Sequence, residues 1–249
     1  MRTLFDNLWK SNSKAGCFFR MDASNQAGPT IYLYTIIGKG YDWETGEIVG
    51  MSAMDFIKAL DACGNAPVVH LRINSPGGDV FEAKAIQTAM MQYPGQIVCH
   101  IDGLAASAAA GLVPYASTVE MSVGAFLMIH KAWCLAAGNT DDMLSVAGIL
   151  EQMDQSIAAD FARKTGMETA QIIEMMSKTT YIDANTAKEQ GFCDSVYEPE
   201  QKVENRFDLS VYGNGPEGLR PVAPASQEPA KMEYDRAYIE RRLACIERI

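Results

Sequence analysis

Two buried strands separated by a helix constrain the fold of this chain more than any other feature. Residues 67–73 and 96–101 form near-continuous apolar runs, and residues 80–93 between them have helical periodicity that stops before Pro94. Strands that are apolar on both faces are typical of parallel sheets covered on both sides. Two such strands joined by a helix form a right-handed crossover unit. The sequence therefore predicts an α/β fold built on parallel strands.

The same alternation continues on both sides of this unit. Further strands are predicted at residues 17–21, 31–37, 118–121, 126–130 and 192–196, and further helices at residues 52–63, 104–115, 141–164, 168–177 and 184–190. Asp183 is a candidate N-cap for the last of these helices. Residues 31–197 are thus expected to form the main domain, after an irregular N-terminal segment at residues 1–30.

The composition changes after Tyr197. Residues 198–212 read as a connecting segment, and residues 213–229, with three glycines and four prolines, read as a linker. Residues 230–249 carry apolar side chains at helical spacing with arginines between them. Such a segment is either an amphipathic helix that docks on a partner or another subunit, or a solvated tail.

Charge and cysteine usage narrow the class of protein. A net charge of −10 argues against a surface that follows nucleic acid phosphates. Six scattered cysteines with no Cys-x-x-Cys pair favour a reducing cytoplasm, and Cys99 and Cys134 lie in apolar segments that predict core positions. The N-terminus lacks the apolar run of a signal peptide, and no segment is long enough to span a membrane. We therefore expect a soluble intracellular protein.

Residues 102–111 place one hydroxyl, that of Ser107, among alanines and glycines just after a buried strand. Alone, such a serine is more often a small residue that eases helix packing. A side chain at a strand-to-helix turn is exposed at the edge of the sheet, however, and the helix N-terminus stabilises negative charge beside it. Ser107 is therefore a candidate nucleophile.

A serine nucleophile needs a base and an oxyanion site, and the sequence offers both. His130 ends an apolar run, a position that is usually structural but that can also face a cleft. Residues 75–78 form a Ser-Pro-Gly-Gly turn without the Gly-Lys ending of a phosphate loop. Its glycines let backbone N–H groups approach a ligand. These three elements are the parts that acyl transfer requires. No metal-ligand spacing is found, so neither a metal nor a cofactor is expected.

From about Ile31 to Val196 the chain resembles the Clp peptidase (ClpP) family of the ClpP/crotonase superfold, most closely its phage head maturation proteases. The resemblance rests on five ordered motifs, at residues 73–81, 102–108, 128–133, 138–143 and 187–194. It implies a repeated β-β-α fold with a protruding long helix and a C-terminal extension.

The resemblance also implies a role for each matching residue. Ser107 would be the nucleophile and His130 the general base, with the amides of Gly78 and Ala108 as the oxyanion hole. The third triad member of the family is an acid two residues before an aromatic, and counting back from Tyr181 gives Thr179.

A threonine hydroxyl can accept a hydrogen bond from the imidazole but carries no charge. Three interpretations stay open. The site is a slow Ser-His dyad oriented by Thr179, or a centre in which another carboxylate such as Asp183 replaces the acid, or a weakened or inactive relative. We favour the slow dyad.

The function that the resemblance implies is a serine endopeptidase that cleaves phage capsid, portal or scaffold proteins, in the host cytoplasm or the prohead. The implied assembly is a homo-oligomeric ring, a heptamer or stacked tetradecamer, paired through the helix at residues 141–164, with no unfoldase ATPase, nucleic acid or membrane as partner.

The alternatives are a catalytically weakened assembly or scaffold protein and a general Clp-type proteolytic subunit. The acyl-CoA enzymes of the crotonase branch need no paired serine and histidine, which counts against that branch. A membrane signal-peptide peptidase is disfavoured because the sequence shows no anchor.

Overall fold

The computed structural model describes residues 18–24, 27–41, 48–198 and 212. Its centre is an eight-stranded sheet. The strands of this sheet are β1 (Phe18–Asp22), β2 (Thr30–Tyr34), β5 (Val68–Ser75), β6 (Gln96–Ala106), β7 (Thr118–Ser122), β8 (Phe126–Ile129), β9 (Thr180–Asp183) and β10 (Ser195–Tyr197). The helices are α2 (Ala53–Ala62), α3 (Val80–Gln92), the 3₁₀ helix η1 (Ser107–Tyr115), α4 (Thr140–Thr165), α5 (Thr169–Ser177) and α6 (Ala184–Glu189).

The sheet is mostly parallel, as the alternation of strands and helices predicts. Its main path runs β1-β2-β5-β6-β7-β10, and only the β1–β2 pairing on this path is antiparallel. β8 pairs in parallel with the end of β6, and β9 completes that side antiparallel to β8. The α/β fold class is therefore confirmed.

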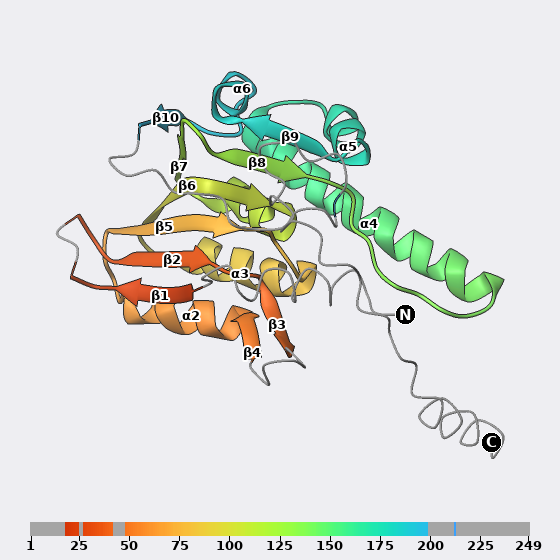
Figure 1. Cartoon of the computed structure of the whole chain (residues 1–249), viewed down its shortest axis with the longest axis horizontal. Coiled ribbons are helices and arrows are strands. Elements are labelled where there is room, and N and C mark those ends of the chain that lie inside the picture. The colour runs from red at the N-terminus through yellow and green to blue at the C-terminus, as the bar shows by residue number, and fades with distance from the viewer. Residues whose placement is uncertain (1–17, 25–26, 42–47, 199–211, 213–249) are drawn as a thin grey trace, which may run out of the picture.

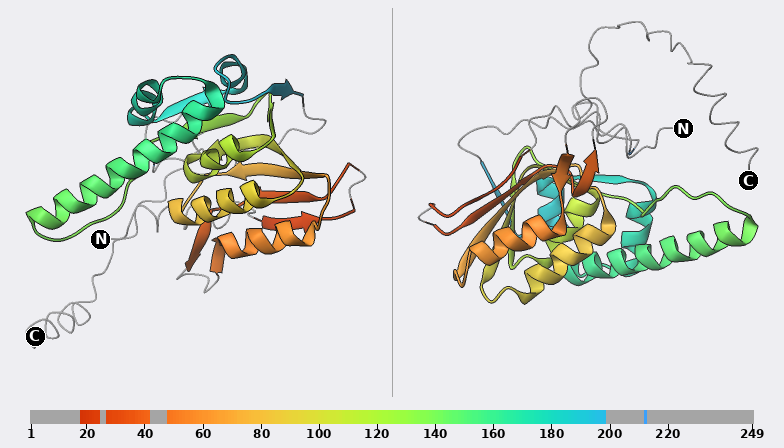
Figure 2. Two further views of the ribbon diagram at one scale, coloured as in Figure 1. Left: turned by 180° about the vertical axis from the view of Figure 1, so that it is seen from behind. Right: turned by 90° about the horizontal axis from the view of Figure 1, so that it is seen from below.

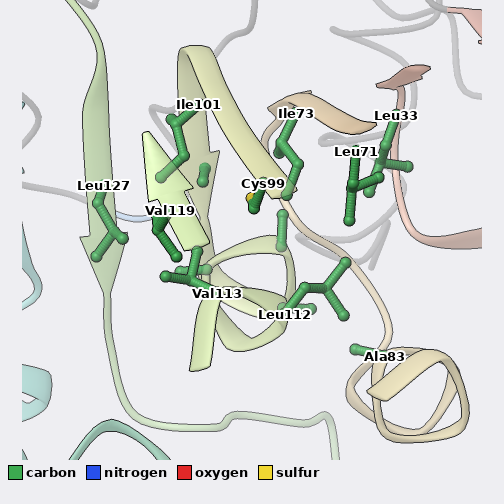
Figure 3. Close-up of a cluster of buried hydrophobic side chains, with 14 of the residues drawn as sticks. Leu33, Leu71, Ile73, Ala83, Cys99, Ile101, Leu112, Val113, Val119 and Leu127 are labelled. Atoms are coloured by element: carbon green, nitrogen blue, oxygen red, sulfur yellow. The ribbon is translucent and has the colours of Figure 1, made fainter. Parts of the chain in front are cut away.

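Helices α2, α3, η1 and α4 lie on one face of the sheet (Figure 2, left). Alternate side chains of the strands point into this layer and are fully buried. In Figure 3, Leu71, Ile73 and Ile101 point from their strands toward Leu112 and Val113 of η1. The removal of this apolar surface from water is the main force that holds the helices on the sheet.

The opposite face of the sheet is toward the viewer in Figure 1. It carries polar side chains, among them Arg72 and Asp102. The Asp102 carboxylate on β6 is almost fully buried and forms an ion pair with Arg72 of β5. It also accepts hydrogen bonds from Tyr34 on β2 at 2.5 Å and from Tyr197 on β10 at 2.6 Å. Burial acts to lower the pKa of Arg72, but the charge of Asp102, its hydrogen bond and the two tyrosines together raise that pKa. One carboxylate thus joins four strands at the level of the motif that leads to Ser107.

The helix predicted at residues 104–115 exists, but its predicted start is wrong. Residues 104–106 continue β6, and the helix begins at Ser107 as a 3₁₀ helix. Alanine favours helix, but Ala105 and Ala106 sit between β5 and β8, whose backbone groups pair with them. Tertiary pairing therefore overrides local propensity, and it moves the turn to Ser107 itself.

Other sequence expectations differ from the structure at element ends. Residues 192–194 precede β10 rather than forming part of it, and β9 is not predicted at all. A small two-stranded sheet, β3 (Gly38–Tyr41) with β4 (Ile48–Met51), is also missed. Cys99 is buried as expected, whereas Cys134 is exposed in the connection before α4. The linker at residues 213–229 and the tail at residues 230–249 lie outside the described residues.

The long helix near residues 141–164 is confirmed as α4, which projects beyond the rest of the domain (Figures 1 and 2). An Asn139 capping box begins it, and Gly166, at φ 75°, ends it. Its buried residues lie only in its second half, while Leu144 and Ile149 in the first half are exposed. The first half of α4 therefore presents apolar side chains to the surroundings.

Candidate active site

Ser107 lies at the point where β6 turns into η1. Its φ of 54° is unusual for a residue that has a side chain. Such a conformation costs about 1–3 kcal/mol and persists only where the surrounding structure enforces it, often at functional sites. The turn leaves the Ser107 side chain half-buried at the end of the strand. This is the geometry that exposes a nucleophile above a sheet.

His130 directly follows β8, the neighbour of β6, and its imidazole reaches Ser107. The Nε2 atom lies 2.7 Å from the Ser107 Oγ atom, which is hydrogen-bond distance. Burial lowers the pKa of His130 to about 4, although a hydrogen bond to the backbone at Lys131 acts in the opposite direction. The imidazole is therefore neutral at pH 7 and can accept the hydroxyl proton. The structure brings the predicted nucleophile and base together.

The predicted oxyanion amides, those of Gly78 and Ala108, lie beside this pair. A Cβ atom on Gly77 would lie 2.5 Å from the Ala106 carbonyl oxygen and 2.7 Å from the Ser107 Cβ atom. A Cβ atom on Gly78 would lie 2.0 Å from the Ile37 carbonyl oxygen. Only glycine allows the turn to approach Ser107 this closely.

Both amides are available to a ligand. The bridge between Ile37 and the glycine turn uses the Gly77 carbonyl and the Asp79 N–H, which leaves the Gly78 N–H outside it. Ala108 is the second residue of η1, where N–H groups have no partner within the helix. Two such donors can stabilise the oxyanion of an acyl-transfer intermediate.

Side chains of the same motif hold the glycine turn in place. The Ser75 hydroxyl donates to the Thr35 carbonyl at 2.6 Å and accepts from the Gly77 N–H at 3.2 Å. Asp79 caps α3 by accepting from the N–H groups of residues 81 and 82. The turn is therefore rigid before any substrate arrives.

Thr179 lies where the acid of the resemblance is expected, but it does not contact the imidazole. The β8–β9 register pairs Ile129 with Thr180, so the next position places Thr179 opposite His130. Within the described residues, no hydrogen bond joins His130 to Thr179 or to any carboxylate. Asp183 is engaged elsewhere, since its carboxylate accepts from the N–H groups of Asn185 and Thr186 and caps α6. The structure thus brings together Ser107, His130 and the two amides, and in the part of the chain that it describes no acid is bonded to the imidazole.

A cavity of about 490 Å³ opens beside Ser107. Its lining includes Gly78, Ala108 and His130, together with apolar side chains of α3 and α4 such as Val80, Met153 and Phe161. This volume suits one or more apolar side chains of a bound ligand. The cavity therefore offers a mainly apolar surface directly beside Ser107.

Two residues near the site are not found from the sequence. Asp154 of α4 is buried and accepts from the Ala132 N–H at 2.7 Å, which fixes the segment after His130. The side chain of Tyr212 packs on the His130 ring, with 4.9 Å between the ring centroids. An acid on the otherwise apolar face of α4 was a detectable signal for Asp154. Nothing in the sequence around Tyr212 indicates its position.

In the part of the chain that the structure describes, no group of three or more His, Cys, Asp or Glu side chains is arranged to hold a metal ion. Within the same residues, none of the helices has the length and apolar character that crossing a bilayer requires.

Residues 44–200 match the family described as Clp protease. The chain is 30% identical to ATP-dependent Clp protease proteolytic subunit 3 of Rhodococcus jostii over 129 residues, which is 51% of this chain and 63% of that protein. It is 30% identical to subunit 2 of Corynebacterium diphtheriae over 135 residues, 53% of this chain and 68% of the relative. It is 28% identical to the chloroplastic subunit 3 of Arabidopsis thaliana over 195 residues, 77% of this chain and 60% of the relative.

The chain thus spans less than two thirds of the length of two of these relatives. The family match nevertheless covers more than half of the chain and includes every residue of the Ser107–His130 site described above except Thr35, Ile37 and Tyr212. The chain belongs to the Clp protease family.

Proposed function

We propose that this protein is a serine endopeptidase in which Ser107 is the nucleophile and His130 the general base. The observation that carries the proposal is the 2.7 Å contact between the Ser107 hydroxyl and the neutral imidazole, next to two available amides. The names of the three relatives, all proteolytic subunits, support the same chemistry.

The reaction follows from these positions. His130 removes the proton from Ser107 as its Oγ atom attacks the carbonyl carbon of the scissile peptide bond. The N–H groups of Gly78 and Ala108 stabilise the resulting oxyanion, and the loss of one such donor typically costs about 3–4 kcal/mol. The imidazolium then protonates the leaving amine, and water releases the acyl group by the reverse sequence.

The finer proposal is a role in phage head maturation, with capsid, portal or scaffold proteins as substrates. It rests on the resemblance of residues 138–143 and 187–194 to the phage branch, and it places the protein in the host cytoplasm or the prohead. Coexpression with the capsid, portal and scaffold proteins, followed by mass spectrometry of new N-termini, tests it. We expect cleavage of at least one of them by the wild type and none by Ser107→Ala. Identical cleavage by both forms contradicts the proposal.

We further propose that the protein assembles as a ring, in which α4 mediates contacts between subunits. The exposed apolar side chains of the first half of α4 support this, since such side chains favour burial against a partner. Enclosure of the site in a ring would restrict substrates to chains that can enter it.

Among the described residues no hydrogen bond joins a carboxylate to His130, and this favours a second candidate, a weakened relative that serves as an assembly component. A buried acid holds the imidazole in the correct tautomer and stabilises its protonated form. Normal particle assembly by Ser107→Ala, together with a wild type that does not react with fluorophosphonates, would support this candidate over the peptidase.

Thr179→Asp separates a slow dyad from an inactive centre. Thr179 has a φ of 51°, which is strained for a β-branched residue but tolerated by aspartate. A carboxylate opposite His130 should raise the rate of peptide cleavage about tenfold or more. It should also raise the pKa of His130 above its value of about 4. Because only the neutral imidazole acts as base, the acid limb of the pH–rate profile then moves to higher pH.

Thr179→Asn is the matched control for this experiment. Asparagine has the shape of aspartate and the same tolerance of positive φ, but no charge. It should leave both the rate and the acid limb close to those of the wild type. Equal behaviour of the Asp and Asn variants would show that position 179 does not act on His130 electrostatically.

A further inference from the structure

Tyr212 follows the family match in the sequence, yet its side chain lies on the catalytic pair. Its hydroxyl donates to the Pro76 carbonyl at 2.7 Å, and its ring is tilted by 51° to that of His130. Its ring also packs against the buried side chains of Leu104, Ala106 and Met128. We call the site formed by Pro76, Leu104, Ala106, Phe126, Met128 and Tyr181 the Tyr212 pocket.

The Tyr212 pocket and the 490 Å³ cavity involve different parts of the glycine turn. The cavity is lined from Gly78 onward, through Asp79 and Val80, and Tyr212 is not among its lining residues. Tyr212 instead contacts Pro76, on the other side of the two glycines. Ser107 and His130 line the cavity and are also in contact with Tyr212, so the two sites meet at the catalytic pair.

The chemistry of acyl transfer gives each site a role. When the substrate oxygen lies on the Gly78 and Ala108 amides, the acyl side chain enters the apolar cavity. The leaving nitrogen must lie within reach of His130 Nε2, which protonates it. The residue after the scissile bond is then beside the imidazole and Pro76, in the space that Tyr212 fills.

We propose that the Tyr212 pocket is the leaving-group subsite of the peptidase, that it takes an aromatic side chain and prefers tyrosine, and that Tyr212 occupies it in competition with substrate. This inference rests on the proposed peptidase function. The apolar wall suits an aromatic ring, and the Pro76 carbonyl accepts from a hydroxyl group at its far end. Burial raises the pKa of Tyr212, so the hydroxyl stays protonated and remains a donor.

Internally quenched peptides that differ only in the residue after the scissile bond test the proposal. The ratio of kcat/KM for tyrosine against alanine at that position is measured for wild type and Tyr212→Ala. A substrate side chain can bind only when Tyr212 is out of the pocket, so apparent affinity falls with the unoccupied fraction. We expect Tyr212→Ala to raise the tyrosine-to-alanine ratio about fivefold or more, mainly through KM.

Two conservative variants sharpen the result. Tyr212→Phe keeps the ring but loses the bond to Pro76, so it should fall between wild type and Tyr212→Ala. Tyr93→Phe is the matched control, since the Tyr93 hydroxyl donates to the Ala66 carbonyl at 2.9 Å away from the site. It should leave the ratio unchanged. A lower rate for Tyr212→Ala on every peptide would overturn the proposal, because Tyr212 would then support His130 rather than compete with substrate.

Two further measurements separate failure of this proposal from failure of the peptidase function. Fluorophosphonate labelling of Ser107 reports on the catalytic pair alone. Binding of product peptides that begin with tyrosine or alanine, measured by fluorescence anisotropy on the double variant Ser107→Ala/Tyr212→Ala, needs no catalysis. If Ser107 is labelled but the double variant binds both peptides equally, the leaving-group subsite is overturned and the peptidase function stands. If the double variant binds the tyrosine peptide more tightly but Ser107 is not labelled, the pocket is supported and the peptidase function is overturned.

Discussion

Ser107→Ala is expected to abolish fluorophosphonate labelling and to lower kcat for peptide cleavage by about 10². In a complete Ser-His-acid centre, loss of the serine lowers kcat by about 10⁶ and loss of the acid alone by about 3 × 10⁴. Since no carboxylate contacts His130 among the described residues, most of the advantage that the acid gives is absent from the wild type. The loss of kcat that remains for Ser107→Ala is then the ratio of these two losses, about 10².

The size of this loss therefore reports on the missing acid. A loss near 10⁶ would mean that a carboxylate from elsewhere supports His130 in the working enzyme. Ser177→Ala is the matched control, because the Ser177 hydroxyl donates to a backbone carbonyl on exposed α5. It should label at the wild-type rate. Labelling that survives Ser107→Ala would remove Ser107 from the mechanism.

Asp102→Asn is expected to lower the free energy of unfolding by about 3 kcal/mol. Removal of one partner of a buried ion pair typically costs about 3–5 kcal/mol, because the other charge stays buried without compensation. The Arg72 side chain retains 30% exposure, which favours the lower end of that range. Asparagine has nearly the volume of aspartate, so no cavity contributes. Chemical denaturation gives the value from the shift in midpoint at constant slope.

Two further variants test this interpretation. Glu174→Gln breaks the exposed Lys178–Glu174 pair, in which both side chains are about two thirds exposed. It should change stability by less than about 1 kcal/mol. Arg72→Met combined with Asp102→Asn removes the uncompensated charge and should recover part of the loss. Equal effects of Asp102→Asn and Glu174→Gln would show that the pair on the sheet adds nothing to stability.

The sequence predicts those parts of the fold in which local pattern and tertiary environment agree. The strands around residues 67–73 and 96–101 are correctly predicted, but only their alternate, apolar side chains are fully buried, while polar side chains such as Arg72 lie on the other face. Residues 104–106 are assigned wrongly because their small side chains suit a helix, whereas pairing with β5 and β8 makes them a strand. β9 is only four residues long and depends on β8 for its pairing, so it gives little signal of its own.

Some residues of the candidate site could likewise be predicted from the sequence, and others could not. Ser107, His130 and the glycine turn lie at strand ends, so topology brings them to one edge of the sheet, and their residue types indicate the chemistry. The contact of Tyr212 with His130 joins residues far apart in the sequence and follows from no periodicity or motif. Counting back from Tyr181 gives Thr179 as the third residue, and the β8–β9 register places it opposite His130. Only the structure shows that no hydrogen bond joins its side chain to the imidazole.

The pairing of Ala106 with Met128 has a consequence for how such an enzyme can be controlled. Ser107 and His130 each extend a strand by one residue, so the ladder between β6 and β8 sets the spacing of hydroxyl and imidazole within a single polypeptide. Assembly does not have to bring the hydroxyl and the imidazole together, because a single folded chain already does so. Under the proposed peptidase function, control of cleavage would therefore have to come from limits on which chains reach the site, through enclosure in a ring or through Tyr212 in its pocket.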